Sequence, residues 1–250
     1  EKGGQTFEEG DEISVYAWTG DATVAPETRE RVVNNAINKL TNGSWVSTPQ
    51  MLWKNNRDKH YFIGVYPISA ISDLSAGEYT FDVNKQTESD LLVAVNKDGL
   101  SYNVDEQQPV PLTFTHVMAK LVVNLTYKNQ WGGIPTVEKV VVGNAAKEAT
   151  INYLTKVVTP STTAKEDFSL PEITENTKYV SVIIPQEDVK QLTIVIGGKN
   201  FVYDNGTPFK FESGKITTVN LEVGRDEIKL GDVKITDWEN GSTFSGEALN

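Results

Sequence analysis

The sequence predicts an all-β protein whose strands pack as β-sandwiches. Short runs of β-branched and aromatic residues recur along the chain, and turn-forming residues separate them about every 8 to 14 positions. Several runs alternate apolar and polar residues, as Ile13, Val15 and Ala17 do, which is typical of half-buried strands. This pattern favours a sandwich over alternating strand and helix units. The 250 residues suffice for one large all-β domain or for two ordinary domains.

Strands are expected wherever these runs occur. The Gly197-Gly198 and Asn205-Gly206 pairs suit hairpin turns, because such turns need backbone angles that glycine and asparagine tolerate. The expected strands cover residues 12–18, 60–67, 77–83, 90–96, 137–144, 178–185, 192–198, 199–206 and 214–223.

A domain boundary is expected near the middle of the chain. Residues 105–111 are polar and acidic and carry two prolines, a composition that predicts a linker. We therefore expect an N-terminal β-sandwich domain over residues 1–110 and a C-terminal one over residues 111–250, the latter ending in a short tail.

Residues 26–40 fit two different structures. Pro26 suits the start of a helix, and the apolar residues that follow recur at helical spacing. The Asn42-Gly43 pair equally suits a strand that turns into a hairpin. The helical spacing involves Val32, Val33, Ala36, Ile37 and Leu40.

Residues 111–125 favour a strand that changes face partway. Leu112 and Phe114 alternate in one phase, and the apolar residues after His116 alternate in the other. A shift of one residue moves side chains to the opposite face, so we expect a bulge or crossover near Thr115 and His116. The second phase comprises Val117, Ala119, Leu121, Val123, Leu125 and Tyr127.

His116 could be a metal or catalytic ligand, or a structural residue held at the bulge. It has no histidine or carboxylate nearby in the sequence, so we expect the structural role. The chain contains only one other histidine, His60, which we expect beside a strand, and it contains no cysteine. No motif of a hydrolase, metalloprotease or nucleotide-binding protein is present, and we expect no enzyme activity, metal or cofactor.

The net charge of −11 argues against nucleic acid as a partner, because an acidic surface repels phosphate backbones. No apolar run approaches the roughly 18–20 residues that a membrane-spanning helix needs.

The string LTFTHVMAKLVVNL at residues 112–125 resembles a hallmark of the fimbrillin family, the pilin and adhesin subunits of Bacteroides-type Gram-negative bacteria. Further segments follow in the order in which that family has them. They are FEEGDEISVYAW (7–18), Trp45, MLWKNNRDKHYFIGVYP (51–67), SDLLVA (89–94), IIPQ (183–186), FKFESGKITTVNLEV (209–223) and DWENGSTFSGEA (237–248).

The resemblance implies two transthyretin-like β-sandwich domains in tandem and export as a lipoprotein to the outer membrane and cell surface. It implies a lipid anchor upstream of Glu1 and a first strand before Phe7 that a protease can remove. It also implies that subunits join as fimbriae by donating an extended strand to one another, by β-augmentation.

The C-terminal tail, residues 239–250, is the candidate donor strand. If extended, it places Phe244, Gly246 and Ala248 on one face, and burying Phe244 would contribute about 2–3 kcal/mol. The alternative is a frayed or folded-back terminus. The tail is rich in serine and glycine, which fits a tip or anchor subunit better than a shaft subunit. The candidate donor residues are Thr243, Phe244, Ser245, Gly246, Glu247, Ala248 and Leu249.

A second hypothesis is a surface lipoprotein that binds glycans on the same scaffold. Exposed aromatic rings stack on sugars, although sandwich cores also bury such rings. Trp131 is the preferred glycan contact among Trp18, Trp45, Trp53 and Trp131, because it lies in a loop with glycine and proline. The leading prediction remains a fimbrial subunit or adhesin whose partners are other subunits and a host protein or glycan.

Overall fold

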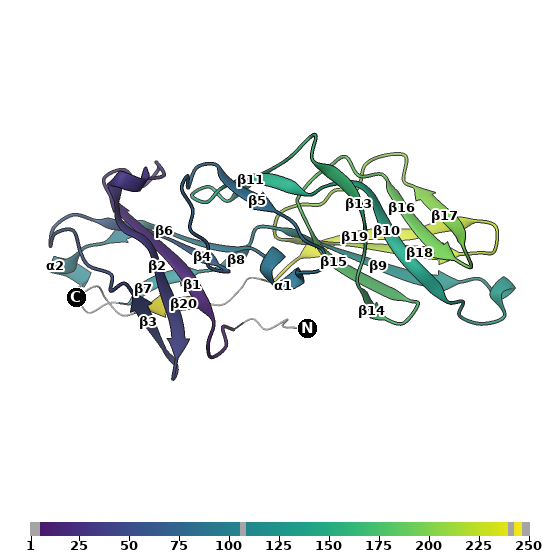
Figure 1. Cartoon of the computed structure of the whole chain (residues 1–250), viewed down its shortest axis with the longest axis horizontal. Helices are drawn as coiled ribbons and strands as arrows, with labels where there is room; N and C mark the ends of the chain where they lie inside the picture. The colour runs from purple at the N-terminus through teal and green to yellow at the C-terminus, as the bar shows by residue number, and fades with distance from the viewer. Residues whose placement is uncertain (1–5, 106–108, 240–242, 247–250) are drawn as a thin grey trace.

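The computed structural model describes residues 6–105, 109–239 and 243–246 of the chain. The molecule is elongated, with two lobes of β-sheet side by side along its long axis (Figure 1). Strands form most of both lobes, and the helices are single turns of three or four residues. The predicted all-β fold of sandwich domains is confirmed. The helical turns are η1 (Thr28–Glu30), α1 (Gln86–Ser89), α2 (Tyr102–Asp105) and η2 (Asn129–Trp131).

The first lobe is built on a six-stranded antiparallel sheet with the order β3-β2-β1-β4-β6-β8. Its central strand β1 is buried on both faces, since Val15 and Ala17 enter one hydrophobic cluster while Tyr16 and Trp18 enter another. The strands are β1 (Glu12–Thr19), β2 (Arg31–Thr41), β3 (Ser44–Thr48), β4 (His60–Tyr66), β6 (Leu92–Leu100) and β8 (Thr115–His116).

The second lobe is a sandwich of two sheets, with strand orders β13-β10-β16-β17 and β14-β15-β9-β18-β19. Strands β9 and β18 are parallel, and the other described pairs of these sheets are antiparallel. The strands are β9 (Ala119–Tyr127), β10 (Val137–Ala146), β13 (Lys165–Ser169), β14 (Glu172–Thr174), β15 (Lys178–Ile183), β16 (Gln191–Ile196), β17 (Lys199–Asp204), β18 (Lys215–Val223) and β19 (Ile228–Asp237).

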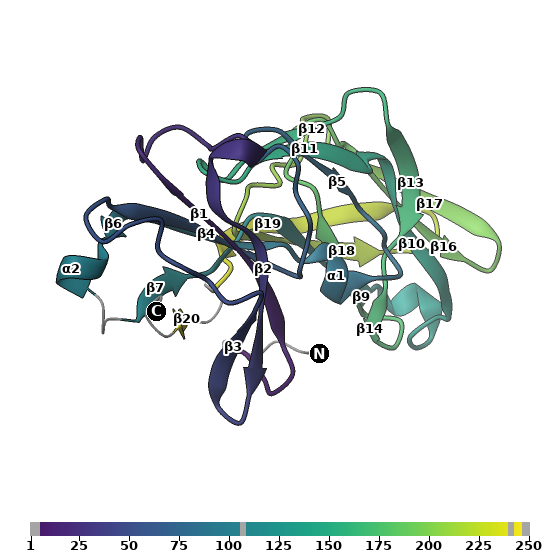
Figure 2. The ribbon, with the colours of Figure 1, turned by 60° about the vertical axis from the view of Figure 1, so that its left-hand side comes forward.

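Strand pairing links the two lobes in both directions. A three-stranded sheet joins β5 (Gly77–Thr80) to β11 (Glu148–Asn152), which pairs in turn with β12 (Val157–Pro160). In the other direction, β20 (Thr243–Gly246) returns to the first lobe and pairs with β7 (Val110–Thr113). Figure 2 shows β5 beside β11 and β20 beside β7. The division of the chain at residue 110 stays a prediction.

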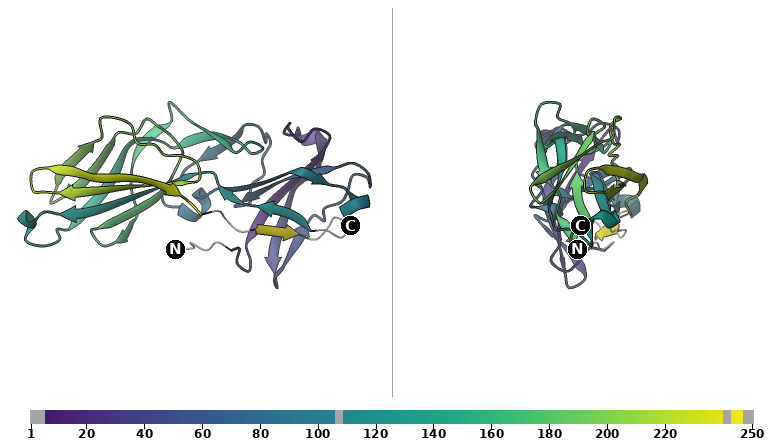
Figure 3. Two further views of the ribbon diagram at one scale, coloured as in Figure 1. Left: turned by 180° about the vertical axis from the view of Figure 1, so that it is seen from behind. Right: turned by 90° about the vertical axis from the view of Figure 1, so that its right-hand side faces the viewer.

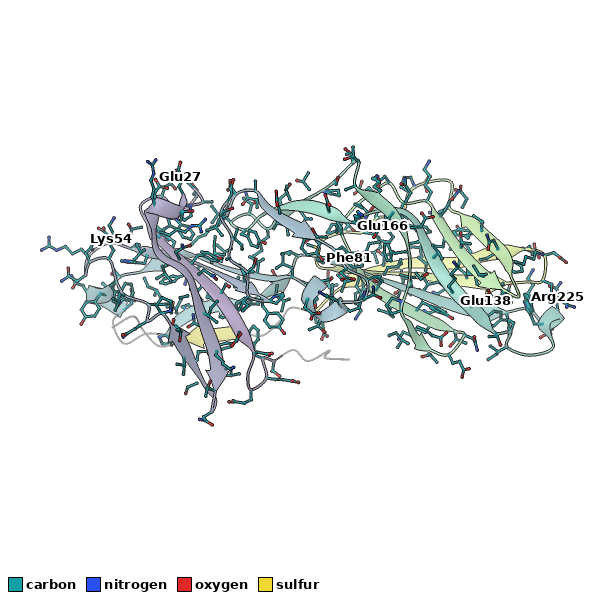
Figure 4. All side chains as sticks on the ribbon, viewed as in Figure 1. Glu27, Lys54, Phe81, Glu138, Glu166 and Arg225 are labelled. Atoms are coloured by element: carbon teal, nitrogen blue, oxygen red, sulfur yellow. The ribbon has the colours of Figure 1, made fainter. Side chains whose placement is uncertain are left out.

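Side chains after β5 also pack against the second lobe. The Gln86 amide donates to Ser181 Oγ at 2.9 Å and accepts from the Val182 backbone N–H at 2.8 Å. The ring centroid of Phe81 lies 5.1 Å from that of Phe168, near the place where the two lobes meet (Figure 4). The lobes are therefore joined by hydrogen bonds and by a shared core, here called the main core.

Residues 26–40 form a short 3-10 turn followed by strand β2, so the strand-and-hairpin alternative is confirmed and the helix is wrong. The helical spacing has a specific cause. Val15 pairs with Ala36 and Ala17 pairs with Val33, so β2 has one extra residue between these pairs. Asn35 has a left-handed backbone at this bulge, with φ of 56°. The bulge puts two buried residues three positions apart, which imitates the spacing on a helix.

Residues 111–125 change face as predicted. Val110, Leu112 and Phe114 are buried in the core of the first lobe, here called the first-lobe core. The buried residues from Val117 to Leu125 belong instead to the main core. The change falls at β8 (Thr115–His116). Residues 110–125 therefore contribute side chains first to the first-lobe core and then to the main core.

Gly197 and Gly198 form the hairpin turn between β16 and β17, as predicted, with φ of 58° and 72°. Two other local predictions, the hairpin at Asn205-Gly206 and the linker at residues 105–111, need correction. Asn205-Gly206 does not join two paired strands, because the chain returns beside residues 186–189, where Phe209 N–H donates to Val189 O. Residues 105–111 are not a linker throughout, because α2 ends within them and β7 begins within them.

Within residues 6–105, 109–239 and 243–246, no helix is long and apolar enough to cross a membrane.

Candidate functional site

Strand β7 forms the outer layer of the first lobe. Its residues Val110 and Leu112, and Phe114 just after it, are buried against the six-stranded sheet. The intervening Pro111 and Thr113 are exposed. This alternation is the period of two that a strand with one buried face requires.

A glycine in the sheet lets β7 approach closely. A Cβ atom on Gly64 of β4 would lie 2.7 Å from Phe114 Cζ and 3.1 Å from Leu112 Cδ1. The first distance is shorter than real Cβ contacts and the second is tighter than most of them, so a side chain at position 64 would force Phe114 or the strand before it to shift. Gly64 therefore fixes the depth at which β7 lies.

An aromatic cluster covers one end of this layer. The Phe7 ring contacts the rings of Trp45, Tyr66 and Phe114 edge-on, with centroid distances of 5.2, 5.7 and 5.2 Å. Burial raises the pKa of Tyr66, and the nearby carboxylate of Asp11 raises it further. This aromatic cluster therefore carries no charge at neutral pH.

The C-terminal tail occupies the open edge of β7. Within the described residues, the outer layer here is a two-stranded antiparallel sheet of β7 and β20. Thr243 pairs with Thr113, Phe244 with Leu112, Ser245 with Pro111 and Gly246 with Val110. Seen from behind, β20 is the short yellow strand beside the teal β7 (Figure 3).

Four of the seven candidate donor residues, Thr243 to Gly246, lie in strand β20. Glu247, Ala248 and Leu249 lie outside the described residues. The strand is folded back onto its own chain, which is the alternative to a free donor. Pairing of the tail with β7 of another copy stays a prediction.

The two histidines are held by hydrogen bonds. His116 Nδ1 lies 2.7 Å from Asp90 Oδ1, a partner 26 positions away that sequence spacing could not identify. His60 Nε2 accepts from the Lys54 backbone N–H at 2.9 Å, and its Nδ1 lies 3.0 Å from Asp58 O. Both arrangements suit structural roles. Among the described residues, no group of three or more His, Cys, Asp or Glu could hold a metal.

Trp131 lies far from β20. Its indole N–H donates to Val223 O at 2.9 Å, and its ring meets Phe201 edge-on at 6.0 Å. The Arg225 guanidinium lies 6.0 Å from the ring centroid, and Figure 4 places Arg225 at the outer end of the second lobe. The ring is half-buried, and its role as a glycan contact stays a prediction.

Comparison with known proteins decides the family. A model of fimbrillin-like proteins matches residues 3–238. The chain belongs to the fimbrillin-like family. No protein with a curated description matches it.

Solved structures share the fold of this fimbrillin-like chain. A putative cell adhesion protein of Bacteroides uniformis superposes with a TM-score of 0.72 at 21% identity, over 95% of each chain. A putative cell adhesion protein of Bacteroides ovatus gives a TM-score of 0.68 at 18% identity, over 94% of this chain and 90% of that one. The C-terminally truncated tip fimbrial protein Mfa3 of Porphyromonas gingivalis gives 0.55 at 12%, over 92% of this chain and 95% of that one.

Proposed function

We propose that this protein is a fimbrial subunit or cell-surface adhesin that assembles by donor-strand exchange. The donor is the tail that contains β20, and the acceptor is the open edge of β7. The observation that carries the proposal is the β20–β7 ladder itself. Membership of the fimbrillin-like family supports the structural and adhesive role.

Removing β20 would leave β7 with unpaired backbone N–H and C=O groups along one edge. The exposed edge would lie beside Val110 and Leu112, which are buried in the folded chain. The tail of a second copy can restore the pairing, because it carries the same residues and can adopt the same register. Exchange of an identical element between copies is a low-cost route to assembly for this reason.

The geometry of exchange favours chains of subunits. Each copy carries one tail and one β7, which are different surfaces, so the contact between copies is head-to-tail. Such contacts extend into open assemblies unless their rotation closes a ring. A tail bound in its own chain blocks the acceptor, so assembly would begin with the release of a tail.

The wider proposal places the subunit at the cell surface, held to the outer membrane by a lipid anchor upstream of Glu1. In this role the protein is not catalytic. Its partners are other subunits and, for an adhesin, a host protein or glycan.

A reversible lock tests the exchange. The chain has no cysteine, so Thr113→Cys with Thr243→Cys would create a single cross-strand pair. Pro111 has no N–H to donate, so its pair with Ser245 is one that makes no ladder hydrogen bonds. Hydrogen-bonded and non-hydrogen-bonded pairs alternate along an antiparallel ladder, so the pair of Thr113 with Thr243, two residues away, is also non-hydrogen-bonded. In such pairs the two Cα atoms lie close enough for a disulfide.

The expected result is that the oxidised chain stays monomeric in size-exclusion chromatography with light scattering. The reduced chain should form multimers after incubation just below its unfolding temperature. A Thr113→Cys chain alone, treated with the same reductant, controls for the reductant and should behave as the reduced chain does. Equal size distributions for the oxidised and reduced double variant would overturn the proposal.

A further inference from the structure

The tail leaves the second lobe at Trp238, the residue after β19. Its backbone N–H donates to Gly214 O at 2.9 Å, which continues the pairing of β19 for one more residue. Its indole ring is half-buried against the main core. Trp238 lies five positions before Thr243, the first residue of β20.

The Trp238 ring is held by two side chains. The His116 imidazole stacks on it, with ring centroids 3.8 Å apart and planes inclined by 11°. Lys120 Nζ lies 5.3 Å from the indole centroid, within the range of a cation–π contact. The indole is thus fixed in position and in orientation.

His116 is itself fixed to the first lobe. Its Nδ1 lies 2.7 Å from Asp90 Oδ1, and its backbone belongs to β8, which pairs with β6. His116 also lies three positions after Thr113, the last residue of β7. The stack therefore joins the base of the tail to the base of the strand on which the tail lies.

A cavity of about 480 Å³ lies beside the stack. His116, Trp238, Lys156 and the turn at Ser213–Lys215 contribute to its walls. Lys156 Nζ bonds to Thr115 Oγ1 at 2.9 Å, and burial lowers the pKa of this lysine, as does the nearby charge of Lys97. The cavity therefore adjoins both the base of the tail and Gly214, whose carbonyl accepts from the Trp238 N–H.

We propose that the Trp238–His116 stack is the pivot of the tail. It positions the tail over β7 and determines the fraction of time for which β20 is detached from β7. Trp238 and His116 are positioning residues in this account, because neither belongs to the β20–β7 ladder. The inference rests on the proposed exchange of the tail and names the residues that control its first step.

Hydrogen exchange of the full chain, measured by mass spectrometry on peptides that cover β7, tests the pivot. Trp238→Ala removes the stack, and the β7 amides should then exchange about two- to tenfold faster, the range that a lost aromatic pair implies. Trp238→Phe keeps an aromatic ring and should exchange within twofold of the wild type. Peptides from β9 report whether the second lobe remains folded and should be unchanged.

Trp131→Ala is the matched control, because it removes a half-buried tryptophan from the same lobe, beside Arg225 at the end remote from β20 (Figure 4). It should leave exchange in β7 unchanged. Equal β7 exchange in Trp238→Ala and Trp131→Ala would overturn the pivot, as would a Trp238→Phe chain as fast as Trp238→Ala. This experiment follows opening within one chain, so its failure is distinct from a failure of assembly between chains.

Discussion

Replacing Gly64 with alanine should push β7 away from its sheet. The added Cβ would lie 2.7 Å from Phe114 Cζ and 3.2 Å from Phe114 Cε1. The Phe114 ring is fully buried and also packs against Phe7, so it cannot turn aside. Overpacking of this kind costs about 1–3 kcal/mol of the free energy of unfolding.

Gly143→Ala is the matched control. Gly143 also lies in a strand, β10, but a Cβ there would approach no atom closer than 3.6 Å. Alanine in place of glycine in such a position leaves stability unchanged or raises it by about 0.4–1 kcal/mol. We therefore expect Gly64→Ala to be less stable than Gly143→Ala by about 2 kcal/mol.

Urea unfolding at equilibrium measures this difference, and thermal unfolding should show it as a midpoint lower by about 4–8 °C for a chain of this size. The rate of amide hydrogen exchange in β7 should rise in Gly64→Ala and not in Gly143→Ala, because displacing β7 disturbs its hydrogen bonds with β20. Free energies of unfolding that agree within about 0.5 kcal/mol for the two variants would refute the close packing of β7 on Gly64.

Two further predictions concern buried polar groups. Burial lowers the pKa of His60, so the folded chain favours neutral imidazole. The contribution of His60 to the free energy of unfolding should be full above the ordinary histidine pKa of about 6.5 and fall as pH drops below it, by at most about 1.4 kcal/mol per pH unit. The free energy of unfolding of His60→Gln, measured in urea, should lose this pH dependence. An unchanged pH dependence in His60→Gln would contradict the prediction. Gln86→Ala should cost about 1–3 kcal/mol in the same assay, because it removes a partner from the buried Ser181. Gln191→Ala, whose amide bonds to exposed Asp204, should change stability by less than about 0.5 kcal/mol, and equal losses in the two variants would count against the packing of residue 86 on the second lobe.

The period-two pattern was sufficient to predict the fold class. It also located the change of face between Phe114 and Val117, because a shift of one residue in the alternation of apolar residues moves the buried side chains to the opposite face of the strand. It failed at Val33 and Ala36, where a bulge in β2 produced a helical spacing. A bulge depends on the neighbouring strand, so a pattern read along one strand cannot identify it.

The candidate site was predictable only in part. The tail could be recognised as a possible strand, but its partner could not, because β7 lies about 130 positions earlier in the sequence. The contacts of His116 with Asp90 and Trp238 were missed for the same reason. One signal was available, since a half-buried histidine at a change of face needs a polar partner from another element.

In the proposed assembly, β7 of one copy accepts the tail of another. Chains with Thr113→Cys alone and chains with Thr243→Cys alone, one of them labelled with ¹⁵N, can be mixed and oxidised slowly. Mass spectrometry then counts the mixed disulfides between them against disulfides between like chains. A Val24→Cys chain, with its cysteine in an exposed loop, replaces Thr243→Cys in the control mixture. Disulfides that join position 113 of one copy to position 243 of another should outnumber the statistical share seen in the control. A statistical mixture in both would contradict it, and would mean that the tail serves only its own chain.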